Sequence, residues 1–246
     1  MPRAGNFKCN SALTMRGGVT LCGHSKEGTV LNFSGANVDC ITFDSTVRYG
    51  GLRDLYVQGY NGAGETKSTV VVAENAPVIL RRCLIWGSLN GLTTAGVDGT
   101  IEDCFIAAKS GTSILSSGAN WYRRCKIDTV PGNSVADAFI QGARSPGLPV
   151  TVMENHFDQC DFSGQFTRSV SINDGGQASA ISVFTGCVMS SNIVITAHNA
   201  ALFTACEFGS TTFTTPGNTA VNGCYKLGPA LSIANATKSG NLAGIS

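Results

Sequence analysis

The sequence predicts an all-β fold, a right-handed parallel β-helix (a solenoid) of roughly 20-residue coils. Three observations point to it: a repeated cysteine pattern, short alternating segments, and a composition poor in charge. Charged residues make up 13% of the 246-residue chain, about half the usual share, and glycine occurs 30 times. Long surface helices need Glu, Lys and Arg on their wet face, so this composition favours short strands joined by tight turns.

The cysteines mark an internal repeat, and a repeat of fixed period is typical of a solenoid. Seven segments share the pattern apolar, x, x, Cys, x, apolar, although Lys226 fills the last position of the seventh. The equivalent segment 51–57 has Leu55 at the cysteine position, as expected for a site that faces inward. Successive spacings of 21, 21, 35, 27, 19 and 18 residues indicate coils with occasional insertions. The seven cysteines are Cys83, Cys104, Cys125, Cys160, Cys187, Cys206 and Cys224.

The segments around these cysteines favour strands over helices. Cys-x-apolar alternates with the period of a strand, and Gly, Ser, Asn and Thr fill the connections. Leucine-rich repeats would need Leu at several fixed positions, and helical repeats would need about 30 residues of amphipathic helix each. A coil of parallel strands about 4.8 Å apart remains, with the cysteines stacked inside it as a ladder.

One cysteine in each coil needs no bonding partner, so we expect buried, reduced thiols. A disulfide framework and a metal site are the alternatives, and the second lacks support because no Cys-x-x-Cys occurs. Cys9, Cys22 and Cys40 lie outside the pattern. Reduced thiols are consistent with assembly in a cytoplasm.

The chain is expected to divide into an N-terminal cap at 1–17, the β-helix at 18–230, and a tail or last irregular coil at 231–246. The cap would cover the open end of the coil, which would otherwise expose unpaired strand edges. The stretch 131–150 contains three prolines and is the expected place of a long loop leaving the coil.

Two runs of the sequence show a family resemblance: residues 18–35, GVTLCGHSKEGTVLNFSG, and residues 51–59, GLRDLYVQG. These runs resemble the opening coils of pectate-lyase-like β-helix proteins, and this form of the pattern is most similar to bacteriophage tailspikes and other virion β-helices. The resemblance extends over about residues 18–226. It implies the fold and a homotrimer with closed symmetry, but little about activity, because this scaffold carries many functions. Phage tailspikes usually have a particle-binding head first, and only 17 residues precede the first coil here.

Several partner classes find no support in the sequence. The net charge is +1 and the longest basic runs are pairs, so no nucleic-acid partner is expected. No stretch of about 18 apolar residues predicts a membrane span, and the first residues lack the apolar core of a secretory signal. No cofactor or metal is expected, because none of the three histidines has metal-ligand spacing to another.

No catalytic site stands out, and three residues are the candidates. Asp161 and Glu207 follow their cysteines by one place, on the outward face and two coils apart. That separation is roughly 9.6 Å, at the edge of the range for inverting glycosidases. Arg144 begins a segment similar to the Arg-x-Pro-x-x-Arg motif of pectate lyases, but Pro149 stands at the second arginine. Solvated surface acids and a loop arginine are the simpler interpretation.

The sequence therefore favours a structural bacteriophage virion protein, either a capsid decoration (cement) protein or a tail-associated β-helix. It would be assembled in the host cytoplasm as a homotrimer and contact other capsid or tail proteins. Two alternatives stay open: a polysaccharide depolymerase, acting as a lyase or glycoside hydrolase, and a non-catalytic adhesin. In both, a host surface glycan is the partner, and outward Trp86 and Trp121 are its candidate platforms.

Overall fold

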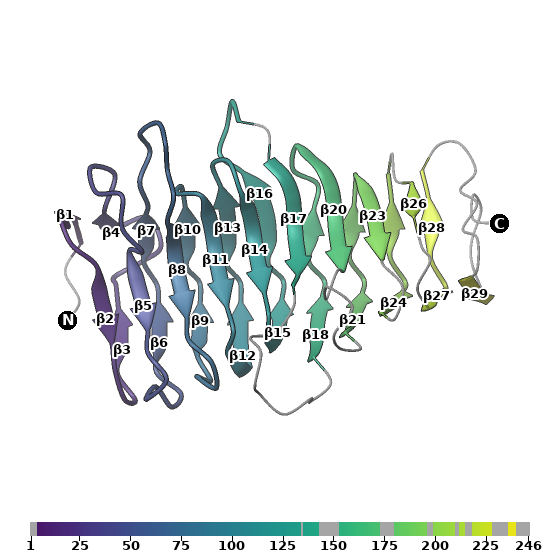
Figure 1. Cartoon of the computed structure of the whole chain (residues 1–246), viewed down its shortest axis with the longest axis horizontal. Helices are drawn as coiled ribbons and strands as arrows, with labels where there is room; N and C mark the ends of the chain where they lie inside the picture. Colours follow the sequence, from purple (N-terminus) through teal and green to yellow (C-terminus); the bar gives the residue numbers. More distant parts are fainter. Residues whose placement is uncertain are drawn as a thin grey trace.

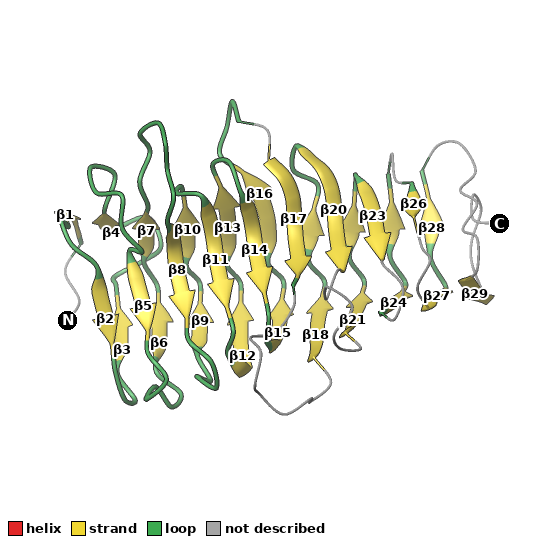
Figure 2. Ribbon diagram, viewed as in Figure 1, coloured by secondary structure: helices red, strands yellow, loops and turns green. Residues whose placement is uncertain are grey.

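The structure is a computed structural model that describes residues 4–133, 135–142, 153–172, 180–195, 199–209, 212–214, 218–227 and 236–239. All regular elements of these residues are strands, and Figure 2 shows no helix among them. Nothing in this part of the chain forms a helix long and apolar enough to cross a membrane.

The strands form three parallel sheets, named A, B and C, which the chain visits in that order in each coil. Sheet A contains β1 (Gly5–Lys8), β4 (Thr29–Asn32), β7 (Tyr56–Gln58), β10 (Leu84–Trp86), β13 (Phe105–Ala108), β16 (Lys126–Thr129), β19 (Asp161–Phe162), β22 (Val188–Met189), β25 (Glu207–Phe208) and β28 (Tyr225–Lys226). Sheet B contains β2 (Leu13–Met15), β5 (Ile41–Phe43), β8 (Ser68–Val72), β11 (Asn90–Thr94), β14 (Thr112–Ser116), β17 (Val135–Gln141), β20 (Phe166–Ile172), β23 (Asn192–Ile195) and β26 (Phe213–Thr214). Sheet C contains β3 (Thr20–Cys22), β6 (Gly51–Arg53), β9 (Ile79–Arg81), β12 (Val97–Glu102), β15 (Ala119–Arg123), β18 (Met153–Asp158), β21 (Ala180–Thr185), β24 (Ala200–Thr204), β27 (Asn218–Asn222) and β29 (Ala236–Ser239).

The coil is right-handed. In Figure 1 the strands of sheet B descend in the front layer and those of sheets A and C ascend behind it, while the coils advance from the N-terminal to the C-terminal end. This is the hand that parallel crossover connections almost always adopt. The predicted fold class, a right-handed parallel β-helix, is therefore confirmed.

One core fills the inside of the coil along its whole described length. The seven repeat cysteines and Leu55 are all buried, and none of the cysteines is in a disulfide, so the predicted inward ladder is present. Beside the ladder, sheet C contributes a stack of aromatic rings whose planes lie 6° to 9° apart, with centroids 4.5 to 5.0 Å apart. Its members are Tyr122, Phe157, Phe184 and Phe203.

A two-residue corner joins sheet C to sheet A, and its first residue has a left-handed backbone. In eight successive coils the φ angle there lies between 50° and 61°. This conformation turns the chain sharply, so the corner side chain points outward and the next one enters the core. The corner residues are Asp54, Arg82, Asp103, Arg124, Gln159, Gly186, Ala205 and Gly223.

Two features differ from what the sequence suggests. Regular pairing begins before residue 18, because β1 and β2 are the first strands of sheets A and B. Within the loop expected at 131–150, residues 135–141 form β17 instead, so that part of the prediction was wrong. The cause is packing: Val135 and Phe139 are completely buried in the core. Residues 143–150 lie outside the described residues.

Candidate functional site

The two acidic candidates from the sequence lie on the outer face of sheet A, with one coil between them. Asp161 pairs in register with Val188 and Val188 with Glu207, so an apolar side chain separates the two carboxylates. An Asp161 oxygen accepts a hydrogen bond from the Ser163 N–H at 2.8 Å, and Glu207 accepts one from the Tyr225 hydroxyl at 2.6 Å. That bond raises the pKa of Tyr225.

These contacts give both acids a local structural task, and a catalytic role for either stays a prediction. Arg144 lies outside the described residues. Within those residues, no group of three or more His, Cys, Asp or Glu side chains could hold a metal ion.

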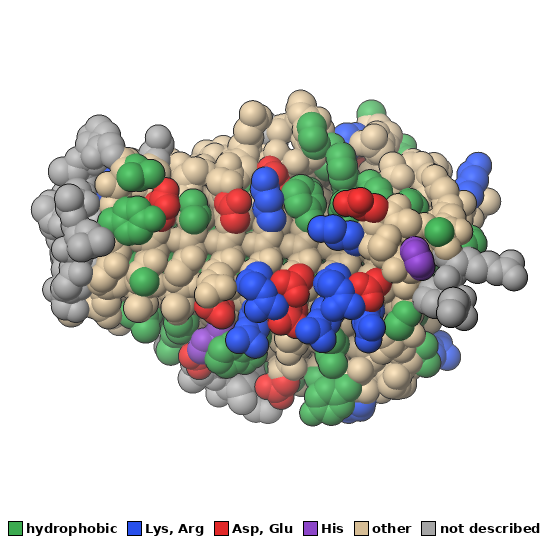
Figure 3. Space-filling model, turned by 180° about the vertical axis from the view of Figure 1, so that it is seen from behind, with side chains coloured by type: hydrophobic (Ala, Val, Ile, Leu, Met, Phe, Trp, Pro, Cys, Tyr) green, Lys and Arg blue, Asp and Glu red, His purple; other side chains and the backbone are tan. Residues whose placement is uncertain are grey.

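Charged side chains gather instead along the corner between sheets C and A, where Figure 3 shows blue and red side chains intermingled. We call this set the corner ladder. At the corner position, aspartate and arginine alternate from Asp54 to Arg124. At the last position of sheet C, Glu102 lies in register between Arg81 and Arg123, whereas Arg53 and Arg81 are like charges in register. The corner ladder consists of Arg53, Asp54, Arg81, Arg82, Glu102, Asp103, Arg123, Arg124 and Asp158.

The arginines of the corner ladder form short, bidentate ion pairs. The Arg82 guanidinium donates to both Asp54 oxygens, at 2.5 and 2.7 Å. Arg124 likewise donates to Asp103 at 2.8 Å and to Glu102 at 2.5 Å. The hydrogen bond from Arg82 lowers the pKa of Asp54 to about 2, and the bond from Arg124 lowers that of Asp103. Carboxylates held in this way are stable anions and poor proton donors at neutral pH.

A hollow of about 310 Å³ opens on the outer face of sheet A. We call it the sheet A hollow. Trp86 of β10, Phe105 of β13 and Asp128 of β16 border it on three successive coils. Thr129 at the end of β16, Pro131 and Gly132 in the connection after it, and Gln165 in the turn before β20 complete it. It combines two aromatic rings with a carboxylate, a hydroxyl and an amide.

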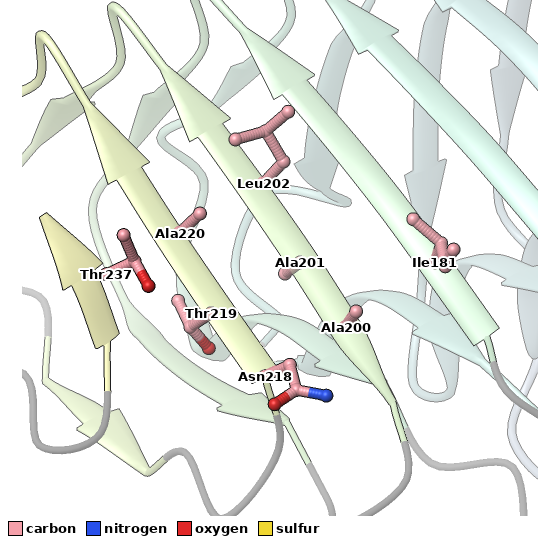
Figure 4. Close-up of a pocket in the computed structure, with 8 residues that line it drawn as sticks. All are labelled: Ile181, Ala200, Ala201, Leu202, Asn218, Thr219, Ala220 and Thr237. Carbon is pink, nitrogen blue, oxygen red and sulfur yellow. The ribbon is translucent and has the colours of Figure 1, made fainter. Parts of the chain in front are cut away.

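A second hollow, of about 300 Å³, lies on sheet C near the C-terminal end of the described chain (Figure 4). Its lining is mostly small and apolar, with Asn218 and Thr237 at its lower and left sides in Figure 4. None of the lining residues is titratable, so this hollow offers no acid, base or nucleophile other than hydroxyl groups. The residues are Ile181, Ala200, Ala201, Leu202, Asn218, Thr219, Ala220 and Thr237.

The sequence alone indicates single members of these groups but not how they assemble. It predicts Trp86 as a glycan platform, and its basic pairs, Arg81–Arg82 and Arg123–Arg124, give no sign of their ion-pair partners. In the ion pairs between coils, the partners of these arginines lie 21 to 35 residues away in the sequence. The cysteine register does align Arg82 with Asp54, and it is the one signal from which the corner ladder could have been inferred.

The class of protein that this structure defines is the right-handed parallel β-helix. No protein-family model matches the chain, and no curated protein matches it. Among solved structures, the fold is similar to that of a pectin methylesterase from Yersinia enterocolitica, with 12% sequence identity and a TM-score of 0.45. The match covers 99% of this chain and 86% of that chain. At this identity it says nothing about activity, and the bacteriophage form of the resemblance stays a prediction.

Proposed function

We propose that the chain is a structural protein of a bacteriophage particle, a capsid decoration or tail-associated β-helix that assembles as a homotrimer. The proposal rests on one observation: the acids of the corner ladder, Asp161 and Glu207 are already bonded to neighbouring groups of the chain. Along the corner ladder they are held in ion pairs, and Asp161 and Glu207 hold hydrogen bonds with their neighbours. Most glycoside hydrolases use two carboxylates at one sugar, and the lining of the sheet A hollow has one and that of the sheet C hollow none.

A largely apolar row on sheet C supports side-to-side assembly. In register it consists of Ile79, Thr100, Trp121, His156, Val183, Leu202 and Ala220, so two polar side chains interrupt it. Trp121 is 49% exposed and stacks on His156, and Ile79 is 42% exposed. Exposed apolar rows on a flat sheet face favour association, and a threefold arrangement would close it. The Arg and Asp side chains of the corner ladder run beside this row, so charged contacts would flank an apolar centre.

Mass spectrometry of purified particles from the source tests the virion role. We expect the chain as a stoichiometric component, and its absence from the particles would overturn the proposal. In parallel, the purified protein is incubated with a broad panel of bacterial polysaccharides and assayed for new reducing ends and unsaturated uronates. No product is expected. A released oligosaccharide would instead establish the depolymerase alternative.

Light scattering coupled to gel filtration tests the homotrimer, with an expected mass three times the 25.5 kDa of the chain. Trp121→Glu places a charge in the apolar row and is expected to shift the particle to monomers. Val19→Glu is the matched control, because Val19 is 58% exposed but lies outside the row. A monomer of the unaltered chain, at concentrations found in particles, would rule out the trimer.

A further inference from the structure

We propose that the sheet A hollow binds one neutral hexopyranose unit of a carbohydrate chain. The proposal adds a ligand to the structural role and does not depend on it. It rests on the aromatic rings, the polar rim, the rigid walls and the charge balance of the hollow, each taken from the described residues.

The aromatic side of the hollow offers ring faces to a ligand. Trp86 and Phe105 are only partly buried, although both belong to short strands held on either side by neighbouring coils. Tyr56 supports the indole from the preceding coil, with ring centroids 6.2 Å apart and planes tilted by 35°. Large rigid rings of this kind give contact area at low entropic cost, and the C–H face of a pyranose is an apolar surface that fits them.

The polar side faces the indole across one coil. Trp86, Ala107 and Asp128 occupy consecutive positions in register, so two strand spacings, roughly 9.6 Å, separate the indole from the carboxylate. Ala107, which separates them in the register, is fully buried and does not line the hollow. A volume of about 310 Å³ is at the small end for ligand sites and suits a sugar ring better than a larger group.

Asp128 keeps acceptor capacity for sugar hydroxyls. One carboxylate oxygen accepts the Thr129 N–H at 2.8 Å, and the other lies 3.4 Å from the Lys126 ammonium. The side chain is still 24% exposed, and each oxygen has two lone-pair positions. The Gln165 amide, which both donates and accepts, is exposed and also lines the hollow. Carboxylate and amide groups together match the alternating donors and acceptors of a hexose.

The walls are fixed before any ligand arrives. Ser113 donates its hydroxyl to the Asp128 carbonyl at 2.6 Å. Gly164 packs so closely on Asp128 that a Cβ there would lie 2.6 Å from a carboxylate oxygen. The hydrogen bond from Ser163 to Asp161 holds the same turn, which gives this acid a positioning role beside Gln165. A preformed site saves the entropy of ordering its loops on binding.

Charge balance indicates a neutral sugar. Lys126 neutralises Asp128, and its ammonium lies 6.0 Å from the centre of the Phe105 ring, at the edge of a cation–π contact. The hollow therefore has no net charge of its own to attract a uronate or a sulfated sugar. Recognition would come from ring stacking and hydroxyl hydrogen bonds.

Binding is tested by calorimetry and tryptophan fluorescence with neutral oligosaccharides of glucose, galactose and mannose, and with polygalacturonate as the charged comparison. We expect at least one neutral oligosaccharide to bind and polygalacturonate not to bind. Trp86→Ala should weaken the affinity at least tenfold, and Asp128→Asn or Gln165→Ala several-fold. Tyr49→Ala is the matched control, since Tyr49 is 67% exposed and far from the hollow in the coil, and it should change nothing.

The melting temperature of each variant verifies that it is folded, and the exposed Gln165 variant keeps the test valid if Trp86→Ala misfolds. Failure of every neutral oligosaccharide to bind overturns the proposal. Binding that persists in all three hollow variants places the ligand elsewhere and also overturns it. Preference for polygalacturonate contradicts the neutral class. None of these results bears on whether the chain is found in particles, so the two proposals fail independently.

Discussion

Every repeat cysteine occupies the same corner of the coil and directs its sulfur at the carbonyl two residues earlier. The Sγ–O distance is 3.2 Å for Cys104 and 3.6 Å for Cys160. Several sulfurs also lie near a carbonyl of the preceding coil, as Cys187 does with Phe157 at 3.5 Å. Burial raises the pKa of Cys104 and Cys187 and raises that of Cys40 to about 12. The seven ladder cysteines and Cys40 are at most 2% exposed, so a reagent cannot reach their sulfurs in the folded chain.

Titration with a thiol reagent should therefore divide the cysteines into two groups by their reaction rate in the native chain. Cys22 is exposed and Cys9 half-buried, so the native chain should show one fast-reacting and one slower thiol. The other eight should react only after denaturation. Cys22→Ser should remove the fast phase and leave the rest. More than two reactive thiols in the native chain would contradict the buried ladder.

The Asp54–Arg82 pair makes stability depend on acid. The folded pKa of Asp54 is about 2, below its ordinary value of 3.8, so the pair stabilises the fold above pH 4 and this contribution is lost as the pH falls from 4 to 2. After discounting for solvent screening, the contribution is about 1 kcal/mol. Urea unfolding at pH 6 and pH 2.5 measures it. The loss between these values should be smaller by that amount in Arg82→Gln, and an equal loss in both proteins would refute the assignment.

At the scale of the element, the corner between sheets C and A decides how the strands meet. Its left-handed residue is Gly in two coils and a side-chain residue in six. Outside glycine, and to a lesser degree asparagine and aspartate, this conformation costs roughly 1 kcal/mol. Arg82 and Arg124 recover part of that cost through their ion pairs. Ala205 has no such compensation from its methyl side chain.

Exchanging two corner residues should shift stability in opposite directions. Gly186→Ala should lower, and Ala205→Gly raise, the free energy of unfolding, each by about 1 kcal/mol or less. Steric crowding does not contribute to the effect of Gly186→Ala, because a Cβ at this position would contact only the Gln159 side chain, at an ordinary distance of 3.5 Å. Chemical denaturation measures both. Shifts of the same sign would show that backbone conformation does not control these corners.

The sequence is informative where the signal is local to one coil. The spacing around Cys104 and Cys125 reveals both the strand and its inward face, because alternation is read within six residues. The sheet A hollow could not be read in this way, since Trp86, Asp128 and Gln165 belong to three different coils with an insertion before the last. The sequence does not predict the strands β1 and β2 either. These strands are only three or four residues long, which is too short for alternation to stand out, and β1 is mostly exposed.

At the scale of the whole molecule, each coil is stabilised by its two neighbours, and the end coils have only one. β1 and β2 pair with β4 and β5 and cover their edges at the N-terminal end. An uncovered edge of parallel strands is a template for pairing with another chain. The first coil therefore protects these edges.

Deleting residues 1–16 should expose the edges of β4 and β5 together with the core around Ile41 and Phe43. We expect a lower melting temperature and concentration-dependent association beyond the native assembly, measured by calorimetry and light scattering. Phe7→Ala, which removes an exposed side chain but keeps the strand, should have little effect. A truncated chain with unaltered size and melting temperature would mean that the first coil covers nothing essential.

The repeated corner also places residues at regular intervals along the outside of the molecule. Successive corner positions lie about 4.8 Å apart, one in each coil. The four corner residues nearest the N-terminus are charged, whereas Gly186, Ala205 and Gly223 are small and uncharged. Arginine or aspartate introduced at these three positions would extend the row of charges without altering the core, and a binding partner with charges at the same spacing would distinguish the two forms.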